Sequence, residues 1–364
     1  MNRVLFVTNG HGEISIADRL AGELRAAAPE IAIEHLGLVG STPTRNAVDV
    51  GPRRRMPSGG LVAMGDVVNI ARDLRAGLAS LTIAQWRFLK SARGGYDAVV
   101  PTGDVFALWM ALRAKAPTIF VGTAKSVSVA PYGNGERSLL RRAKAVFVRD
   151  EATAADLRRT GVAASAPGNV IADLYEGGDD RAFEAVARGL ERIIAVLPGS
   201  RQSAYDNAAE ALDIFAEATQ GRSRVGAVVS IAPGIDEERM TRALEHHERV
   251  RTWRGDLGPL LRASTLVLGQ AGTANEGAAA MGVPVVAVAK NRSWYRRRQA
   301  KLLGDALVLL AADRTSSAQR LRELLDDRDE RDRRGAIGRA RLGPPGGAKA
   351  IAAEVARIVR EFAR

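Results

Sequence analysis

The sequence predicts an α/β protein built from two doubly wound parallel sheets. Three observations predict this fold class. Residues 4–36 read as a strand, a helix and a second strand. After a polar, glycine-containing stretch at 176–180, a buried strand at 193–197 starts the same alternation again. A strand, a glycine turn and a helix follow at 266–288. A chain of 364 residues is long enough for two such domains.

The composition excludes several kinds of chemistry. The chain has no cysteine, which excludes disulfides, thiolate metal sites and a cysteine nucleophile. Four histidines are too few to indicate a zinc cluster, and we assign no metal and no cofactor. The net charge is +12, and the excess is larger in residues 1–170. This bias predicts an anionic partner, such as a membrane surface or a phosphorylated substrate, although an arginine-rich genome would produce the same excess.

The N-terminus lacks the long apolar segment of a signal peptide. No apolar run approaches the roughly 20 residues that a membrane-spanning helix requires. We therefore expect a cytoplasmic protein that can lie peripherally on the inner face of the cytoplasmic membrane. Nucleic acid is not among the predicted partners, because no recognition motif for it is present.

The first strand, at residues 4–7, leads into a glycine-flanked loop before a helix predicted over 14–27. The loop contains Gly10, His11, Gly12 and Glu13. Ligands of parallel sheets bind beyond the carboxyl ends of the strands, and the glycines allow close backbone approach. Because histidine titrates near neutrality, His11 is a candidate general base. The alternative is a loop histidine that bonds a neighbouring backbone group.

A long basic loop at 37–65 contains Arg53, Arg54 and Arg55. Two helices are predicted after it, at 67–81 and 82–93, with Thr82 and Gln85 as a capping box for the second. The second helix carries Trp86 among basic residues, a pattern that suits a helix at an anionic membrane surface. The alternative is core packing with a solvated basic face.

Two more strands of the first sheet are predicted to end in polar turns. The strand at 98–100 leads to Asp104, which either caps the next helix or acts as a general base. The strand at 118–121 leads to a turn containing Lys125 and Ser126. A strand at 145–148 and a helix at 150–159 follow.

The second domain begins with the buried strand at 193–197, which runs into Gly199, Ser200 and Arg201. Such a turn can hold a phosphate through its backbone N–H groups and a guanidinium. Further strands are predicted at 225–231 and 250–253.

The stretch 266–288 carries the strongest indication of a ligand site. Its strand ends in Gln270, Ala271 and Gly272, and Thr273 with Glu276 forms a capping-box pattern. A glycine turn before a helix N-terminus directs free N–H groups and the helix dipole at one point, which favours an anion. Glu276 could accept hydrogen bonds from a ribose diol. We interpret the stretch as a nucleotide-sugar diphosphate site, the alternative being an ordinary capped helix.

The end of the chain is helical. A mixed-charge run at 326–334 contains an Asp-x-Asp triplet, which we interpret as a solvated helix face rather than a metal site. A glycine-rich break precedes an amphipathic helix at 350–362. We place a first domain at 1–176 and a second at 177–346, with the helix at 347–364 packing back on the first.

Several stretches together resemble the lipid-A-disaccharide synthase-related family. They are TNGHGE at 8–13, PSGG at 57–60, RDLRAGL at 72–78, GD at 103–104, FVGTAKS at 120–126, LPGSR at 197–201 and GQAGTANEGAAAMGVPVV at 269–286. The resemblance implies the GT-B fold, with two Rossmann-like domains facing a central cleft. It also implies a metal-independent, inverting glycosyltransferase whose first domain binds the acceptor and whose second domain binds a UDP-sugar.

The resulting hypothesis is transfer of an N-acetylglucosamine-type sugar to a lipid-linked acceptor. His11 or Asp104 would be the base, and Gln299 could contact the donor sugar. Gly10, Gly12, Glu13, Lys125 and Ser126 would line the acceptor side. The alternatives are a UDP-sugar epimerase on the same fold and a non-catalytic UDP-sugar or lipid-binding protein.

Overall fold

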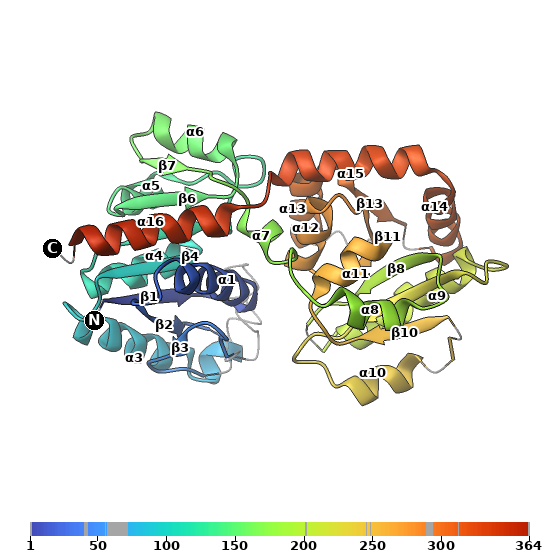
Figure 1. The fold of residues 1–364 in the computed structure, drawn as a ribbon, viewed down its shortest axis with the longest axis horizontal. Helices are drawn as coiled ribbons and strands as arrows, with labels where there is room; N and C mark the ends of the chain where they lie inside the picture. The colour runs from blue at the N-terminus through green and yellow to red at the C-terminus, as the bar shows by residue number, and fades with distance from the viewer. Residues whose placement is uncertain are drawn as a thin grey trace. The chain divides into compact units, whose positions relative to one another are not determined.

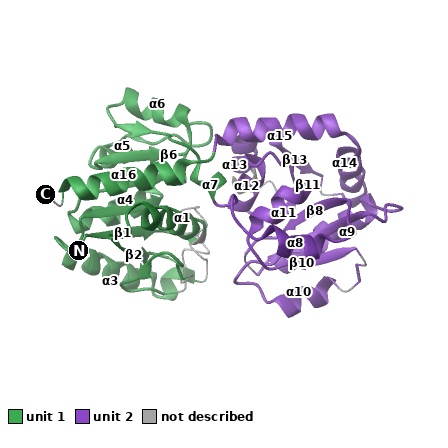
Figure 2. Ribbon diagram, in the orientation of Figure 1, with its two compact units in different colours: residues 1–173, 345–364 green, residues 174–344 purple. Residues whose placement is uncertain are grey.

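A computed structural model describes residues 2–39, 43–54, 56, 72–200, 202–244, 246–247, 249–288, 294–311 and 313–362, with the backbone alone at 11 and 294–296. The chain divides into two compact units (Figure 2). Unit 1 comprises residues 1–173 and 345–364, and unit 2 comprises residues 174–344. Each unit is built around one parallel sheet with helices on its faces (Figure 1).

The sheet of unit 1 has seven strands in the order β3-β2-β1-β4-β5-β6-β7. Their bounds are β1 Arg3–Thr8, β2 Ala32–Gly37, β3 Val48–Asp49, β4 Ala98–Gly103, β5 Ile119–Gly122, β6 Ala145–Val148 and β7 Ala164–Ser165. The chain runs outward from β1 on one side and from β4 on the other. The strand order therefore reverses between β1 and β4, and this switch point is where such sheets bind ligands.

The helices of unit 1 cover this sheet with apolar faces. They are α1 His11–Ala27, α3 Leu78–Ser91, α4 Val105–Ala111, α5 Asn134–Leu140, α6 Glu151–Arg159, α7 Val170–Asp173 and α16 Gly347–Phe362, with a 3₁₀ turn η2 at Leu112–Ala114. The last helix, α16, packs beside α1 at the other end of the chain (Figure 1). Ile351, Val355 and Val359 are buried there, which follows from their spacing along one helix face.

Asp173 fixes the start of α16. Its carboxylate accepts hydrogen bonds from the backbone N–H groups of Gly346 at 2.5 Å and Ala348 at 2.6 Å. Gly168 approaches so closely that a Cβ built on it would lie 2.6 Å from the nitrogen of Gly347. A carboxylate at a helix N-terminus satisfies amides that have no partner within the helix. The C-terminal helix is thus part of unit 1.

The sheet of unit 2 has six strands in the order β10-β9-β8-β11-β12-β13. Their bounds are β8 Arg192–Leu197, β9 Val225–Ser230, β10 Val250–Trp253, β11 Ser264–Gly269, β12 Val285–Val288 and β13 Leu307–Leu310. The order reverses between β8 and β11, so the turns after these two strands lie at the second switch point.

The helices of unit 2 are α8 Asp180–Ala187, α9 Ala204–Ala218, α10 Glu237–Leu244, α11 Leu257–Ala263, α12 Thr273–Ala280, α13 Trp294–Leu303, α14 Arg314–Asp326 and α15 Arg328–Leu342, with a 3₁₀ turn η3 at Gly304–Ala306. Helices α12 and α15 pack through glycines. A Cβ built on Gly338 would lie 2.3 Å from the carbonyl oxygen of Ala279. A Cβ built on Gly335 would lie 2.2 Å from that of Gly282.

The structure corrects three predictions of helix starts and boundaries that were made from local sequence patterns. Thr82 does not begin a helix, because it lies inside α3 and its hydroxyl donates to the carbonyl of Leu78 at 2.9 Å. Gln85 is buried and donates its amide to the carbonyl of Leu38 at 3.0 Å. Of the helix predicted at 67–81, residues 67–71 lie outside the described residues, 72–75 are helical and 76–77 form a turn, so the break before α3 lies at Gly77 rather than at Thr82. Helix α1 begins at His11, so 11–13 form its first turn rather than a loop. Within the described residues no helix is long and apolar enough to cross a bilayer.

Candidate functional site

Asp104 stands at the switch point of unit 1, directly after β4. Its Oδ1 accepts the backbone N–H of Ala107 at 2.9 Å, so it is the N-cap of α4. Its Oδ2 accepts the side-chain amide of Asn9 at 2.8 Å, across from the end of β1. Both oxygens are therefore already hydrogen-bonded. Asn9 was missed as a site residue, although its place after a buried strand was the available signal.

Glu13, in the first turn of α1, lies beside this pair. A Cβ built on Gly10 would lie 2.5 Å from Glu13 Oε2, and one built on Gly103 would lie 2.6 Å from Oε1. The half-buried carboxyl group thus lies between the backbones at the ends of β1 and β4. Burial, with a further contribution from the charge of Asp104, raises the pKa of Glu13 to about 8.

The segment between β5 and α5, with the first turn of α5, contributes a second polar group. Lys125 forms an ion pair with Glu136 at 2.6 Å, and its ammonium lies 5.6 Å from the centre of the Tyr132 ring. Ser126 is buried. The hydroxyl of Tyr132 is buried and has no hydrogen-bond partner within the described part of the chain. Burial raises the pKa of Tyr132, so this hydroxyl keeps its proton. The sequence did not single out Tyr132.

The backbone of His11 begins α1 next to Gly10, and Gly12 follows it in the first turn. The side chain of His11 lies outside the described set. The candidate group of unit 1 therefore consists of Asn9, Glu13 and Asp104, with His11 held on the same turn as Glu13.

The turns after β8 and β11 form the switch point of unit 2. The N–H of Gln270 donates to the carbonyl of Leu197 at 2.9 Å, which joins the two strand ends. The turn after β8 continues through Gly199, with φ of +105°, and Ser200. Arg201 lies outside the described residues. The backbone thus brings the predicted phosphate turn and the predicted nucleotide turn to one edge.

Buried amides hold the turn at 270–272. Gln299, on α13, is 4% exposed and donates its side-chain amide to the carbonyl of Ala271 at 3.2 Å. Asn275 is fully buried and donates to the carbonyl of Gly269 at 3.1 Å. Its Oδ1 is buried without a partner among the residues described. Gln299 thus fixes the shape of the turn, and its contact with a donor sugar remains a prediction.

Helix α12 begins one residue earlier than its capping pattern suggests. Its N-cap is Gly272, which forms no side-chain hydrogen bond, and Thr273 is the first helical residue. The predicted capping box of Thr273 and Glu276 is therefore wrong. A glycine N-cap leaves room and donors for a ligand at the positive end of the helix.

Tyr175 is buried against the start of α12. A Cβ built on Gly277 would lie 1.9 Å from Tyr175 Cε2, so the ring occupies the space that a side chain would take. Burial and the charge of Glu276 both raise the pKa of Tyr175. The aromatic ring therefore supports the turn of α12 that carries Glu276.

The basic residues predicted to face a membrane are partly occupied by contacts within unit 1. Arg53 forms an ion pair with Asp49 at 2.8 Å. Arg54 donates to the carbonyl of Ala76 at 3.1 Å. Trp86 is half-buried against the core, with the Lys90 ammonium 5.1 Å from its ring centre. Arg55 lies outside the described residues.

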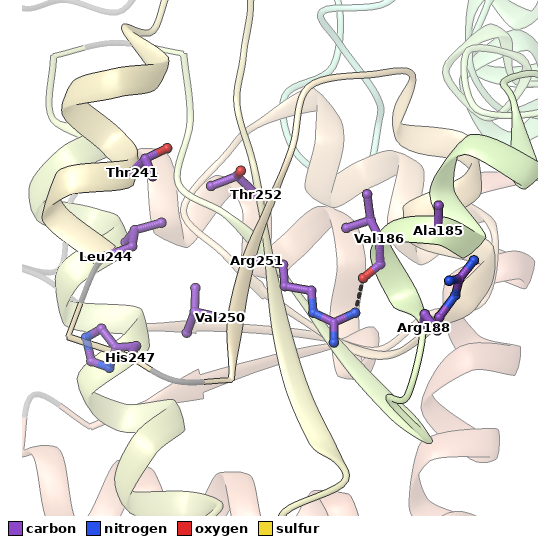
Figure 3. A pocket seen from close by; sticks show the side chains of 9 residues that line it. All are labelled: Ala185, Val186, Arg188, Thr241, Leu244, His247, Val250, Arg251 and Thr252. Atoms are coloured by element: carbon purple, nitrogen blue, oxygen red, sulfur yellow. Dashed lines mark hydrogen bonds between the residues drawn. The ribbon is translucent and has the colours of Figure 1, made fainter.

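A cavity of about 690 Å³ lies at the edge strand β10 rather than at a switch point. Figure 3 shows its lining, which comes from the end of α8, from α10 with the turn after it and from β10. It contains none of the predicted site residues. Among described residues, no group of three or more His, Asp or Glu side chains is placed to hold a metal ion.

No protein-family model matches the chain, and no curated protein matches it in sequence. Solved structures do match over both units. The calicheamicin glycosyltransferase CalG4 superposes with a TM-score of 0.66 at 17% identity, covering 100% of both chains. A putative UDP-N-acetylglucosamine 2-epimerase from Listeria monocytogenes gives 0.60 at 14%, covering 99% of this chain and 96% of its own.

The glycosyltransferase SnogD from Streptomyces nogalater gives a TM-score of 0.58 at 20% identity, covering 98% of this chain and 100% of its own. At these identities the likeness establishes architecture rather than activity. Two parallel-sheet, Rossmann-like units in one chain, matched over their full length by these enzymes, give this protein the GT-B fold.

Proposed function

We propose that the protein is a glycosyltransferase that moves an N-acetylglucosamine-type sugar from a UDP-sugar to a lipid-linked acceptor, without a metal and with inversion. The observation that carries the proposal is the switch point of unit 2. There α12 begins at a glycine N-cap beside the turn after β8. Buried side-chain amides fix the shape of the turn at 270–272 that precedes α12. Such a rigid set of amide donors suits a diphosphate.

On the donor side, the backbone N–H groups of Ala271, Gly272 and Thr273 are the proposed donors to the leaving UDP. The N–H of Gln270, which the sequence also suggested, already donates to the carbonyl of Leu197 at 2.9 Å. Gly199 and Ser200, with Arg201 after them, add donors from the neighbouring strand end. These groups stabilise the charge that develops on UDP as the glycosidic bond breaks. Glu276, one turn into α12, accepts hydrogen bonds from the ribose.

On the acceptor side, the switch point of unit 1 supplies the proton chemistry. The acceptor hydroxyl attacks the anomeric carbon, and a base takes its proton as the new bond forms. His11 and Asp104 are the two candidates. Because both oxygens of Asp104 already accept hydrogen bonds, we propose His11 as the base. Gly10, Gly12, Lys125 and Ser126 are proposed to line the acceptor beside this base.

The lipid-linked acceptor and the peripheral location at an anionic membrane remain part of this proposal. Their support is the positive charge of the chain and the basic residues around Trp86. Arg53 and Arg54 can reach lipid only with part of each guanidinium, because each already has a partner within unit 1.

An epimerase is the second candidate, because UDP-N-acetylglucosamine 2-epimerases are among the structures that match the chain. Time-resolved NMR of the protein with UDP-N-acetylglucosamine alone separates the two. Epimerisation needs no acceptor and produces a new anomeric signal. A transferase releases UDP only when a lipid extract is added. Binding without either change supports a non-catalytic binding protein.

Replacement of Glu276 by alanine should weaken UDP binding by about 1–3 kcal/mol, the cost of losing a hydrogen bond to a charged group. UMP should lose as much as UDP-sugars, because the contact is to ribose. Calorimetry measures both. Asp329→Ala is the matched control, since Asp329 also lies in the first turn of a helix of unit 2. Equal affinity of Glu276→Ala and wild type would remove Glu276 from the site.

A further inference from the structure

The Glu13 carboxyl group lies between two segments of backbone. Its two oxygens lie against Gly10 and Gly103, at positions that a Cβ on either residue would overlap. Gly103 has φ of +121°, which also favours glycine, whereas Gly10 has φ of 166°, an extended conformation that any residue adopts. At Gly10, therefore, the Glu13 carboxyl rather than the backbone conformation requires the absence of a side chain.

The surroundings of this carboxyl favour its neutral form. No described residue donates a hydrogen bond to it, and the carboxylate of Asp104 lies beside it at the β4–α4 junction. Asp104 itself receives two hydrogen bonds, from Ala107 and Asn9. The positive end of α1 favours an ionised Glu13, but this effect is small beside desolvation and a neighbouring like charge. The other titratable residue on the same turn is His11.

A second neutral hydroxyl lies at the neighbouring strand end. Gly103 and Gly122 are register partners in β4 and β5. A Cβ built on Gly122 would lie 2.5 Å from the hydroxyl oxygen of Tyr132. That residue is 3% exposed and its hydroxyl has no partner among the described residues. The strand end next to the half-buried Glu13 carboxyl thus carries a buried hydroxyl without a partner among the described residues, although buried polar groups are normally hydrogen-bonded.

We propose that Glu13 is a specificity-determining residue of the acceptor site. Its side chain binds in the form of a neutral carboxylic acid and donates its O–H to an oxygen of the acceptor substrate. This inference rests on the proposed function, and it assigns Glu13 a role different from that of the base. A neutral acid is a hydrogen-bond donor, whereas the ionised form accepts only and repels an anionic acceptor. Acceptor binding then weakens as Glu13 loses its proton above a pH of about 8.

Two substitutions of Glu13 distinguish the effect of its hydrogen-bond donor from the effect of its charge. Glutamine keeps a donor and is neutral at every pH, whereas alanine removes both. With UDP-N-acetylglucosamine as donor and a lipid extract as acceptor, Glu13→Ala should raise the KM for acceptor about 10–100-fold with a smaller change in kcat. Glu13→Gln should raise it only a few-fold and should abolish the rise of KM above pH 8 that wild type shows.

Gly10→Ala provides an independent variant, because its added methyl group displaces the Glu13 carboxyl without straining the backbone. It should raise the KM for acceptor as Glu13→Ala does, and the double variant should show no further increase. Additive effects of the two changes would overturn the inference. So would a Glu13→Gln variant that behaves like Glu13→Ala or that keeps the alkaline loss of wild type.

Infrared difference spectra between pH 7 and pH 10 test the protonation without any turnover. Wild type should lose the carbonyl band of a neutral carboxylic acid as the pH rises, and Glu13→Gln should lack that band at both. If wild type lacks the band at pH 7, the inference fails whether or not UDP is released. If the band is present but wild type releases no UDP with any acceptor tried, the proposed function fails instead.

Discussion

Replacement of His11 by alanine is expected to lower turnover by about 10²–10⁴-fold, the usual contribution of a general base. UDP affinity should stay nearly constant, because the predicted UDP contacts lie in unit 2. In wild type, turnover should rise across the pH range in which histidine titrates. Release of UDP with a lipid extract as acceptor is the measurement.

Asp104→Asn tests the competing assignment, and asparagine is also a good N-cap, so the fold should be kept. Asp150→Asn is its matched control, because Asp150 also follows a strand and caps a helix, accepting the N–H of Thr153 at 2.8 Å. Urea unfolding should show similar small losses in both. A large loss of turnover in Asp104→Asn alone, with His11→Ala near wild type, would make Asp104 the base. If His11→Ala and Asp104→Asn both kept near wild-type turnover, neither residue would be the base, and the base would lie elsewhere.

Gly338→Ala is expected to destabilise unit 2 by about 1–3 kcal/mol or more, because the added methyl group meets the backbone of α12 rather than a movable side chain. The clash should outweigh the roughly 1 kcal/mol that alanine gains over glycine in a helix. Since α12 carries the predicted UDP contacts, UDP affinity should fall as well. Urea unfolding and calorimetry measure the two effects.

Gly135→Ala is the matched control for this substitution. Gly135 is also helical, in α5, but a Cβ built on it meets nothing within 4 Å. Alanine there should be neutral or stabilising by up to about 1 kcal/mol. If Gly338→Ala behaved in the same way, α12 and α15 would have room to separate, and close glycine packing would not determine their contact.

The fold class followed from local patterns, and the prediction of two doubly wound parallel sheets with the GT-B fold is confirmed. Apolar runs such as 4–7 and 193–197 are buried strands, because a strand covered on both faces must be apolar throughout. Helix boundaries were less predictable. Thr82 and Thr273 both carry capping sequences, yet one lies inside α3 and the other follows a glycine cap. We infer that tertiary packing determines where these helices begin, because the free energy of a single capping hydrogen bond is small.

By itself the sequence determined which residues stand at strand ends, because alternation of strand, turn and helix is a property of short segments. It thus placed His11, Asp104 and Gly272 at carboxyl edges of sheets. Only the tertiary structure decided which side chains meet there. The Glu13 carboxyl lies against Gly103, 90 positions along the chain, and Gln299 holds the carbonyl of Ala271. Such contacts depend on strand order and on close packing between distant segments, which no local periodicity encodes.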